Sequence, residues 1–550
     1  MIKYKNKYYL IKDYILFSKF RSFFILLILF FQNLYFKFQK TLSIREYILK
    51  LNELISSNLE PPKTDITIWY MNISSHLVKP SLFAIVGVFI MKLCELVGAD
   101  VNYIHCKSGF DYCHSGANPT NPSKKMPCYS CVKFNETLYF GSSKLVFNNN
   151  SNKTYLSESI QLEKLINYKY KNLNVGKICL PSIKSILRTS EISDKDDGIH
   201  HLKKAIESSI AFIDWLDYEY SQNKPEKIVV FNGLNFNEAI LREWGLDKKI
   251  SVITFENGKR ESTVEFSNKI AVVSGFEFRD RKLDLKEEEK IKSFMNNRMV
   301  ASSSPGNFTS WENNATHVFQ KKIDKYKFIV SIFPNLSWDT AQAQSYDIFD
   351  SMWDWLDSLI SIIKKNKDIL FVIRAHPAEA YVIKRTFNST KEWFYRNSLN
   401  NYPNVSLIDA DTPFNSYELI NISNFCLVSN STIGLEAQYL ETPTLASSWS
   451  AYSEFDLVTK PESLNEYNEI LNDWVSGNIN DLSKYNYDKL NSYLYQYFFE
   501  TEFSFDDYIE NYQSNHYAFK NKSIVNFRTI NNYENILKGI IGNGSFKNNE

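Results

Sequence analysis

The chain has 550 residues, of which 44% are hydrophobic and 23% are charged, and its formal net charge is +1. This length is more than one ordinary hydrophobic core needs, so we expect at least two domains. The composition is that of a globular protein, and the near-zero charge disfavours binding to nucleic acid or another polyanion.

The first forty residues are basic and apolar. An uncharged span runs only from Ser22 to Phe36, which is short for a bilayer-spanning helix of about 20 apolar residues. Lysines precede this span and no small-residue cleavage site follows it, so we do not expect a removable signal peptide. We expect residues 1–60 to form a hydrophobic helical segment that either lies on a membrane surface or packs as a buried helix on the protein body.

Strands and helices alternate in the next region. Apolar runs predict strands at 65–74, 100–106, 226–231 and 250–255, and residues 79–99 have the apolar spacing of a helix. A strand, helix, strand succession at this spacing predicts parallel βαβ units. We therefore expect an amino-terminal Rossmann-like domain over residues 61–300.

A Ser- and Asn-rich stretch near residue 300 marks a boundary. Five further strands follow it, with helical patterns between them of which residues 349–366 are the clearest. The predicted strands are 326–333, 368–375, 404–410, 425–428 and 443–447. The fold class that we expect is α/β, with two doubly wound domains facing a cleft. The second domain spans 320–480, and 481–550 form a helical tail.

One turn of the second domain is unusually rich in hydroxyl groups. The apolar run Phe425 to Val428 stops at Ser429, Asn430, Ser431 and Thr432, and a helical pattern begins directly after them. Ligands of open α/β sheets bind outside the carboxyl ends of the strands, and a helix start can hold a phosphate there. Because the same residue types are preferred helix caps, capping is the simpler interpretation of this turn alone.

A second turn of the same domain favours the phosphate interpretation. Arg374 and His376 follow the predicted strand 368–375, and Pro377 fixes the turn. Arginine and histidine beside hydroxyl groups suit a phosphate leaving group. Two such turns in one domain are hard to explain by capping.

Three motifs carry a resemblance to a known family: "IRAHPAE" at 373–379, the stretch 411–446 and "SAYSEFDLVTKPESLNEY" at 450–467. They resemble the carboxyl-terminal half of capsule or surface polysaccharide biosynthesis proteins, which are GT-B glycosyltransferases with histidine-proline and serine/threonine motifs. The resemblance is strongest over residues 326–466, and it is uninformative about the sugar.

The resemblance also implies roles for single residues. His376 would contact the donor phosphate with Arg374 nearby, Ser431 and Thr432 would bind phosphate with support from Ser429, and Glu436 would hold the ribose hydroxyls. The donor would be a CMP-, UDP- or GDP-linked sugar.

The implied reaction is a metal-independent transfer of the sugar to a capsular polysaccharide or lipid-linked glycan. It needs a general base in the amino-terminal domain, for which His76 and Glu256 are the candidates. This function would place the protein in the cytoplasm, at the inner face of the cell membrane. The alternatives are a CDP-polyol phosphotransferase of envelope polymer synthesis and a non-catalytic assembly protein that keeps the fold.

Four of the seven cysteines form a cluster between residues 106 and 131. The cluster consists of Cys106, Cys113, Cys128 and Cys131. The closing C-x-x-C and the overall spacing resemble a structural zinc knuckle. Disulfides are the alternative if this part is extracellular, and an iron–sulfur cluster is a further one.

Overall fold

The computed structural model describes most of the chain. The described residues are 44–57, 64–73, 80–149, 155–157, 159–193, 197–268, 270, 276–299, 322, 324–342, 345–380, 386–479, 486–513, 516–520, 533–542 and 546–547. Residues 1–43 and 58–60 of the predicted helical segment 1–60 lie outside them. None of the helices among the described residues is long and apolar enough to span a membrane.

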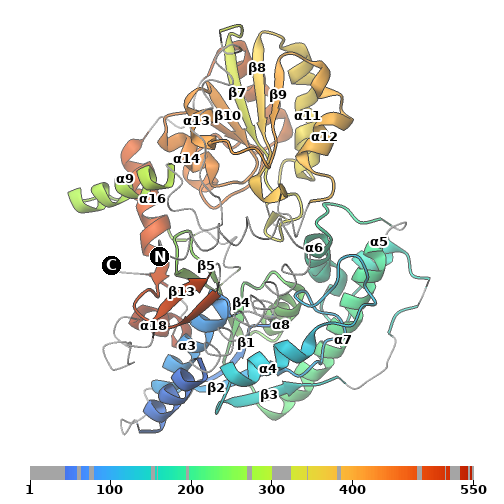
Figure 1. The fold of residues 1–550 in the computed structure, drawn as a ribbon, viewed down its shortest axis with the longest axis vertical. Coiled ribbons are helices and arrows are strands. Elements are labelled where there is room, and N and C mark those ends of the chain that lie inside the picture. Colours follow the sequence, from blue (N-terminus) through green and yellow to red (C-terminus); the bar gives the residue numbers. More distant parts are fainter. Residues whose placement is uncertain are drawn as a thin grey trace, which may run out of the picture.

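The amino-terminal domain is built on a seven-stranded sheet (Figure 1). Its strands are β1 (Thr67–Met71), β2 (Asp100–Cys106), β3 (Ser143–Phe147), β4 (Lys227–Phe231), β5 (Ser251–Asn257), β6 (Thr263–Ser267) and β12 (Glu502–Ser504). The order across the sheet is β12-β6-β5-β4-β1-β2-β3. Strands β1 to β5 pair in parallel, whereas β6 and β12 are antiparallel at one edge.

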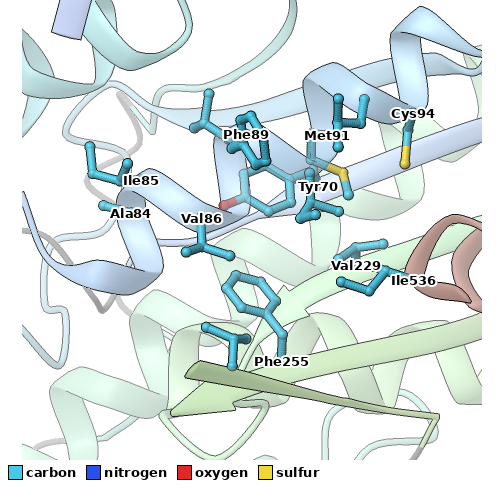
Figure 2. Close-up of a cluster of buried hydrophobic side chains, with 14 of the residues drawn as sticks. Tyr70, Ala84, Ile85, Val86, Phe89, Met91, Cys94, Val229, Phe255 and Ile536 are labelled. Atoms are coloured by element: carbon cyan, nitrogen blue, oxygen red, sulfur yellow. The ribbon is translucent and has the colours of Figure 1, made fainter. Parts of the chain in front are cut away.

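Helices cover both faces of this sheet, because buried parallel strands need an apolar layer on each side. They are α3 (Leu82–Leu96), α4 (Cys128–Leu138), α5 (Leu162–Ile166), α6 (Val175–Leu187), α7 (Gly198–Gln222) and α8 (Phe236–Asp247). Helix α3 starts at the N-cap Ser81, whose Oγ accepts a hydrogen bond from the Ala84 N–H at 3.1 Å. It packs on Tyr70 of β1 and Phe255 of β5 (Figure 2). The approach is so close that a Cβ on Gly87 would lie 2.1 Å from Tyr70 Oη.

The carboxyl-terminal domain has a five-stranded, fully parallel sheet. Its strands are β7 (Phe328–Phe333), β8 (Ile369–Arg374), β9 (Val405–Ile408), β10 (Phe425–Val428) and β11 (Thr444–Ala446), in the order β11-β10-β7-β8-β9. Its helices are α11 (Met352–Lys365), α12 (Thr390–Arg396), α13 (Ser416–Asn421), α14 (Ile433–Tyr439) and α15 (Leu464–Ser476). The predicted strands and the predicted helix 349–366 are confirmed.

Both sheets share one chain order. Numbered from its own first strand, each domain runs 3-2-1-4-5 across its parallel strands, which is the order of a doubly wound Rossmann fold. Apolar cores lie on both faces of each sheet. The predicted fold class, an α/β protein of two Rossmann-like domains as in GT-B proteins, is confirmed.

The tail of the chain returns to the amino-terminal domain. Helix α16 (Tyr487–Tyr495) and a π-helical turn, η5 (Gln496–Glu500), lead into β12, which pairs with β6. The buried Glu502 of β12 accepts hydrogen bonds from Arg260 Nε at 3.2 Å and Thr263 Oγ1 at 2.8 Å. The tail, which the sequence predicts as helical, therefore also supplies an edge strand.

Two other segments extend the domains. The tail ends with a hairpin of β13 (Ile509–Gln513) and β14 (His516–Phe519) and with α18 (Glu534–Ile541). Helix α9 (Leu285–Met299) falls before the predicted boundary near residue 300, yet its buried side chains belong to a core of the carboxyl-terminal domain. Residues 44–57 are helical and pack into the amino-terminal core through Ile44, Ile48 and Leu51.

Candidate functional site

The carboxyl-terminal sheet reverses its strand order between β7 and β10. Ligands of open α/β folds bind at this switch point, outside the carboxyl ends of the strands. The turn after β10 begins at Ser429, the turn after β7 begins at Pro334, and the turn that carries His376 follows β8. Because β7 lies between β8 and β10, the two sequence-predicted turns are not direct neighbours, and the β7 turn stands between them.

Asn430 ties the β10 turn to the β7 turn. Its Oδ1 accepts hydrogen bonds from Asn335 Nδ2 at 3.0 Å and Gln342 Nε2 at 2.7 Å, and its Nδ2 donates to Ser345 Oγ at 2.6 Å. Since all of these bonds join side chains at the switch point, this asparagine fixes the shape of the site rather than presenting a free group.

The hydroxyl residues beside Asn430 differ in exposure. Ser429 is fully buried and its Oγ lies 3.3 Å from Ser448 Oγ. Ser431 and Thr432 are partly exposed, and Ser431 Oγ accepts a weak capping bond from the Ile433 N–H at 3.4 Å. Ser431 and Thr432 are thus the partly exposed hydroxyl residues of this turn, whereas Ser429 can only support the turn.

His376 lies in the turn between β8 and a short 3₁₀ helix, η2 (Pro377–Ala380). The Ala378 N–H donates to His376 Nδ1 at 3.2 Å, which leaves Nε2 to carry the proton of the neutral ring. Burial, and then the charge of Arg374, lower the pKa of His376 to about 4. At neutral pH this histidine is therefore an uncharged hydrogen-bond donor.

Arg374 is a structural group. Its side chain is 2% exposed, and its guanidinium donates to the carbonyl oxygens of Asp409 at 2.6 Å, Thr412 at 3.3 Å and Phe414 at 3.4 Å. Burial lowers its pKa to about 10, and the nearby Asp409 and Asp411 oppose that change. The arginine thus holds the loop after β9 and adds a positive field beside His376.

Glu436 of α14 is 3% exposed. Its two carboxylate oxygens accept hydrogen bonds from Arg298 Nε and from Tyr417 Oη, each at 2.8 Å. Arg298 belongs to α9, so this ion pair fixes that helix on the carboxyl-terminal domain. Binding of ribose by Glu436 stays a prediction, and it would need the remaining lone pairs of a carboxylate that is already engaged.

Of the two candidate bases, Glu256 lies among the described residues and His76 lies outside them. Glu256 is near the carboxyl end of β5, where its oxygens accept from Asn232 Nδ2 at 2.8 Å and the Asn257 N–H at 2.9 Å. Burial raises the pKa of Glu256 to about 7, and the charges of Glu265 and Asp339 add to this increase. A carboxyl group with this pKa suits general base catalysis near neutral pH.

Three residues at the boundary of the two domains were not predicted from the sequence as site residues. Arg188 follows α6 of the amino-terminal domain, and its guanidinium carbon lies 3.8 Å from the ring centre of Trp338 in the β7 turn. Asp339 follows Trp338, and burial raises the pKa of its carboxyl. Trp338 and Asp339 follow the predicted strand 326–333, so the rule that ligands bind outside the carboxyl ends of the strands could have found them. No sequence pattern marks Arg188.

The four clustered cysteines line one small cavity of about 20 Å³ together with Met126 and Phe110. Cys113 Sγ accepts a hydrogen bond from the Gly116 N–H at 3.2 Å. Burial raises the pKa of Cys106, Cys113 and Cys131. Among the described residues, no group of three or more His, Cys, Asp or Glu side chains is placed to hold a metal ion. The predicted zinc site is therefore not supported by this arrangement of the thiols.

No protein-family model and none of the curated proteins match the chain. Solved structures with which it aligns include two KpsC structures from Thermosulfurimonas dismutans. One, a beta Kdo 2,7 transferase, is 14% identical with a TM-score of 0.29, and the alignment covers 45% of this chain and 73% of that one. The other, a beta Kdo 2,4 transferase, is 10% identical with a TM-score of 0.31, and the alignment covers 57% and 87%.

A UDP-GlcNAc 2-epimerase from Neisseria meningitidis, bound to UDP-GlcNAc, is 11% identical with a TM-score of 0.26 over 78% of this chain and 98% of that chain. At such identities and TM-scores the likeness carries no argument about activity.

Proposed function

We propose that this protein is a glycosyltransferase that moves a sugar from a nucleotide-sugar donor to a surface polysaccharide or lipid-linked glycan. The observation that carries the proposal is the division of polar groups between the two domains. The turns after β8 and β10 of the carboxyl-terminal sheet offer hydrogen-bond donors, among them Ser431, Thr432 and the neutral His376, which suit a nucleotide phosphate. The amino-terminal domain offers Glu256, a carboxyl group with a pKa of about 7.

This division matches what the reaction needs. The bond between the anomeric carbon and the phosphate oxygen breaks, and its electron pair stays on the phosphate. The oxygen of an acceptor hydroxyl forms the new bond to that carbon, and its proton passes to the Glu256 carboxylate. Hydrogen-bond donors that face the developing negative charge lower the barrier of such a step, and a base removes the acceptor proton.

A metal ion has no assigned step in this scheme. His376 Nε2, the hydroxyls of Ser431 and Thr432 and the backbone N–H groups of the turn would hold the phosphate. Helix α14 has only seven residues, so its dipole adds little. Nothing in the proposal depends on the cysteine cluster.

A thermal-shift screen tests the proposal. The purified full-length protein is titrated with CMP, CDP, UDP and GDP, and then with sugars linked to the nucleotide that binds. A ligand at 100 times its dissociation constant stabilises the folded protein by about 2.7 kcal/mol. We expect one nucleotide to raise the melting temperature, and His376→Ala to reduce that rise. If none of the four changes the melting temperature, the proposal is wrong.

The same screen separates two alternatives. A CDP-polyol phosphotransferase would release CMP from a CDP-linked polyol, whereas a glycosyltransferase would release CMP, UDP or GDP from the matching CMP-, UDP- or GDP-linked sugar. A non-catalytic assembly protein would release no nucleotide from any of these donors. Chromatography of the nucleotide product formed from each donor therefore decides between the three functions.

A further inference from the structure

Among the described residues, neither Arg374 nor His376 gives the proposed phosphate site a free positive charge. The Arg374 guanidinium is directed at three carbonyl oxygens, and the pKa of His376, about 4, leaves its ring uncharged at neutral pH. The leaving phosphate nevertheless gains negative charge as the bond to the sugar breaks, and a positive charge is a strong way to stabilise it. A cation from the amino-terminal domain would meet this charge.

Arg188 is such a cation. It is the C-cap of α6. Helix α6 lies on the side of the amino-terminal domain that faces the carboxyl-terminal domain (Figure 1). The backbone of Arg188 is left-handed, with a φ of 58°, and its carbonyl oxygen accepts a hydrogen bond from the Phe387 N–H at 2.9 Å. Nearby, Ser190 Oγ accepts a hydrogen bond from Trp353 Nε1 at 2.7 Å. Two residues of one amino-terminal segment, Arg188 and Ser190, thus hold it against the carboxyl-terminal domain.

The guanidinium of Arg188 lies over Trp338, at 3.8 Å from the ring centre. Trp338 packs with Leu336 and Ala378 in one apolar cluster, and its Nε1 donates to Thr386 Oγ1 at 2.8 Å. Ala378 is the residue whose N–H donates to His376 Nδ1. Arg188 therefore covers the aromatic ring that packs against the His376 turn.

No carboxylate of the described residues forms an ion pair with this guanidinium. In the part of the chain that the structure describes, no ion pair and no side-chain hydrogen bond involves Arg188. Asp339 is the charged group that acts on it: burial lowers the pKa of Arg188, and the charge of Asp339 opposes that decrease. The Asp339 carboxylate itself accepts a hydrogen bond from the Ala341 N–H at 3.0 Å.

We propose that Arg188 is a catalytic residue that contacts the phosphate of the nucleotide leaving group from the amino-terminal domain. The inference rests on the proposed function, since it assigns a second-domain ligand to the same phosphate. Stacking on an indole fixes the plane of the guanidinium and leaves its N–H edge free for a bidentate contact with phosphate oxygens. Because the contact bridges the domains, the donor phosphate also helps to hold them together.

Calorimetric titration of Arg188→Gln tests this assignment. Each of CMP, CDP, UDP and GDP is titrated beside its matched nucleoside (cytidine, uridine or guanosine), so that the ratio of the two affinities reports the phosphate contact alone. We expect Arg188→Gln to reduce this ratio by about tenfold to a hundredfold, the range for a hydrogen bond to a charged group. Nucleoside affinity should stay unchanged, which a general loss of structure would not allow.

Two further variants serve as controls. Arg396→Gln removes an exposed arginine of α12 and should leave the ratio unchanged. Arg188→Lys keeps the charge without the planar fork and should lose less than Arg188→Gln. If both Arg188 variants keep the wild-type ratio, the inference is overturned while the proposed function stands. Absence of any nucleotide binding by the wild-type protein would overturn both.

Discussion

The amino-terminal and carboxyl-terminal domains have the same strand order and different chemistry at the ends of their strands. After β8 and β10, the carboxyl-terminal domain presents groups that donate hydrogen bonds, such as Thr432 and the His376 ring. At the end of β5, the amino-terminal domain presents the Glu256 carboxyl, held by Asn232. In both domains the backbone topology places polar side chains at the carboxyl ends of the strands. The types of these side chains determine which domain can bind a phosphate and which can supply a base.

Glu256→Gln tests the amino-terminal side of this comparison. Removal of a general base lowers turnover by about 100-fold to 10,000-fold, and the nucleotide should still bind because its site is in the other domain. In the wild-type protein, kcat/KM should fall about tenfold per pH unit below pH 7, since the base acts only when deprotonated. Turnover assays from pH 5 to pH 9 measure both effects. A variant with wild-type turnover would remove Glu256 from the reaction and leave His76 as the candidate.

His376→Ala tests the carboxyl-terminal side. Loss of one hydrogen-bond donor to a developing oxyanion costs about 100-fold to 1,000-fold in turnover, and nucleotide affinity should fall as well. Because the pKa of His376 is about 4, the wild-type pH profile should show no titration of this residue between pH 6 and pH 8. His200→Ala, at an exposed histidine of α7, is the control and should keep full activity.

The raised pKa of Glu256 also predicts a pH-dependent stability difference. The folded state binds this proton more tightly than the unfolded state does, so the stabilising contribution is complete below about pH 4.5 and is lost as the pH rises through 7. The free energy of unfolding of Glu256→Gln, relative to that of the wild type, should therefore increase by about 2 to 3 kcal/mol from pH 4.5 to pH 8. Urea titrations at both pH values measure the difference. A constant difference would show that the carboxyl group is not perturbed.

Gly87→Ala separates folding of the amino-terminal domain from the site chemistry. The new Cβ would lie 2.1 Å from Tyr70 Oη and 2.9 Å from Phe255 Cζ, so we expect a loss of about 1 to 3 kcal/mol in the free energy of unfolding. Nucleotide affinity at a temperature where the variant is folded should stay at the wild-type value. An unchanged urea midpoint would contradict the packing in Figure 2.

The metal content of the protein has the smallest expected effect on activity, because no catalytic step depends on it. Elemental analysis of protein purified without chelators decides the sequence prediction of a structural zinc. One zinc per chain would mean that the four thiols converge on the ion when it is present. Protein without zinc or iron would leave the loop held by packing and by N–H···S bonds such as that to Cys113.

Strand positions could be predicted from sequence because apolar runs between turn residues are local signals. The runs at 326–333 and 368–375, for example, correspond to β7 and β8. Their spatial order is not a local property. The sequence predicted Arg374 and His376 beside the hydroxyl groups of the turn after 425–428, whereas β7 lies between β8 and β10.

Contacts between distant segments were also beyond the sequence. Nothing near Glu436 indicates that Arg298, 138 residues earlier, is its ion-pair partner. The same is true of Arg188 and Trp338, which come from different domains. A side chain's residue type predicts what chemistry it can do, and its partners in the fold determine whether it is free to do so.

Amide hydrogen exchange with and without the nucleotide selected by the screen tests whether the phosphate site and the base lie in different domains. We expect slower exchange on nucleotide binding in peptides that cover residues 375–380 and 429–436, and in the peptide that contains Arg188. We expect no change in β1 to β3 of the amino-terminal sheet. Protection confined to the amino-terminal domain, with none at the β8 and β10 turns, would contradict the division of chemistry between the two domains.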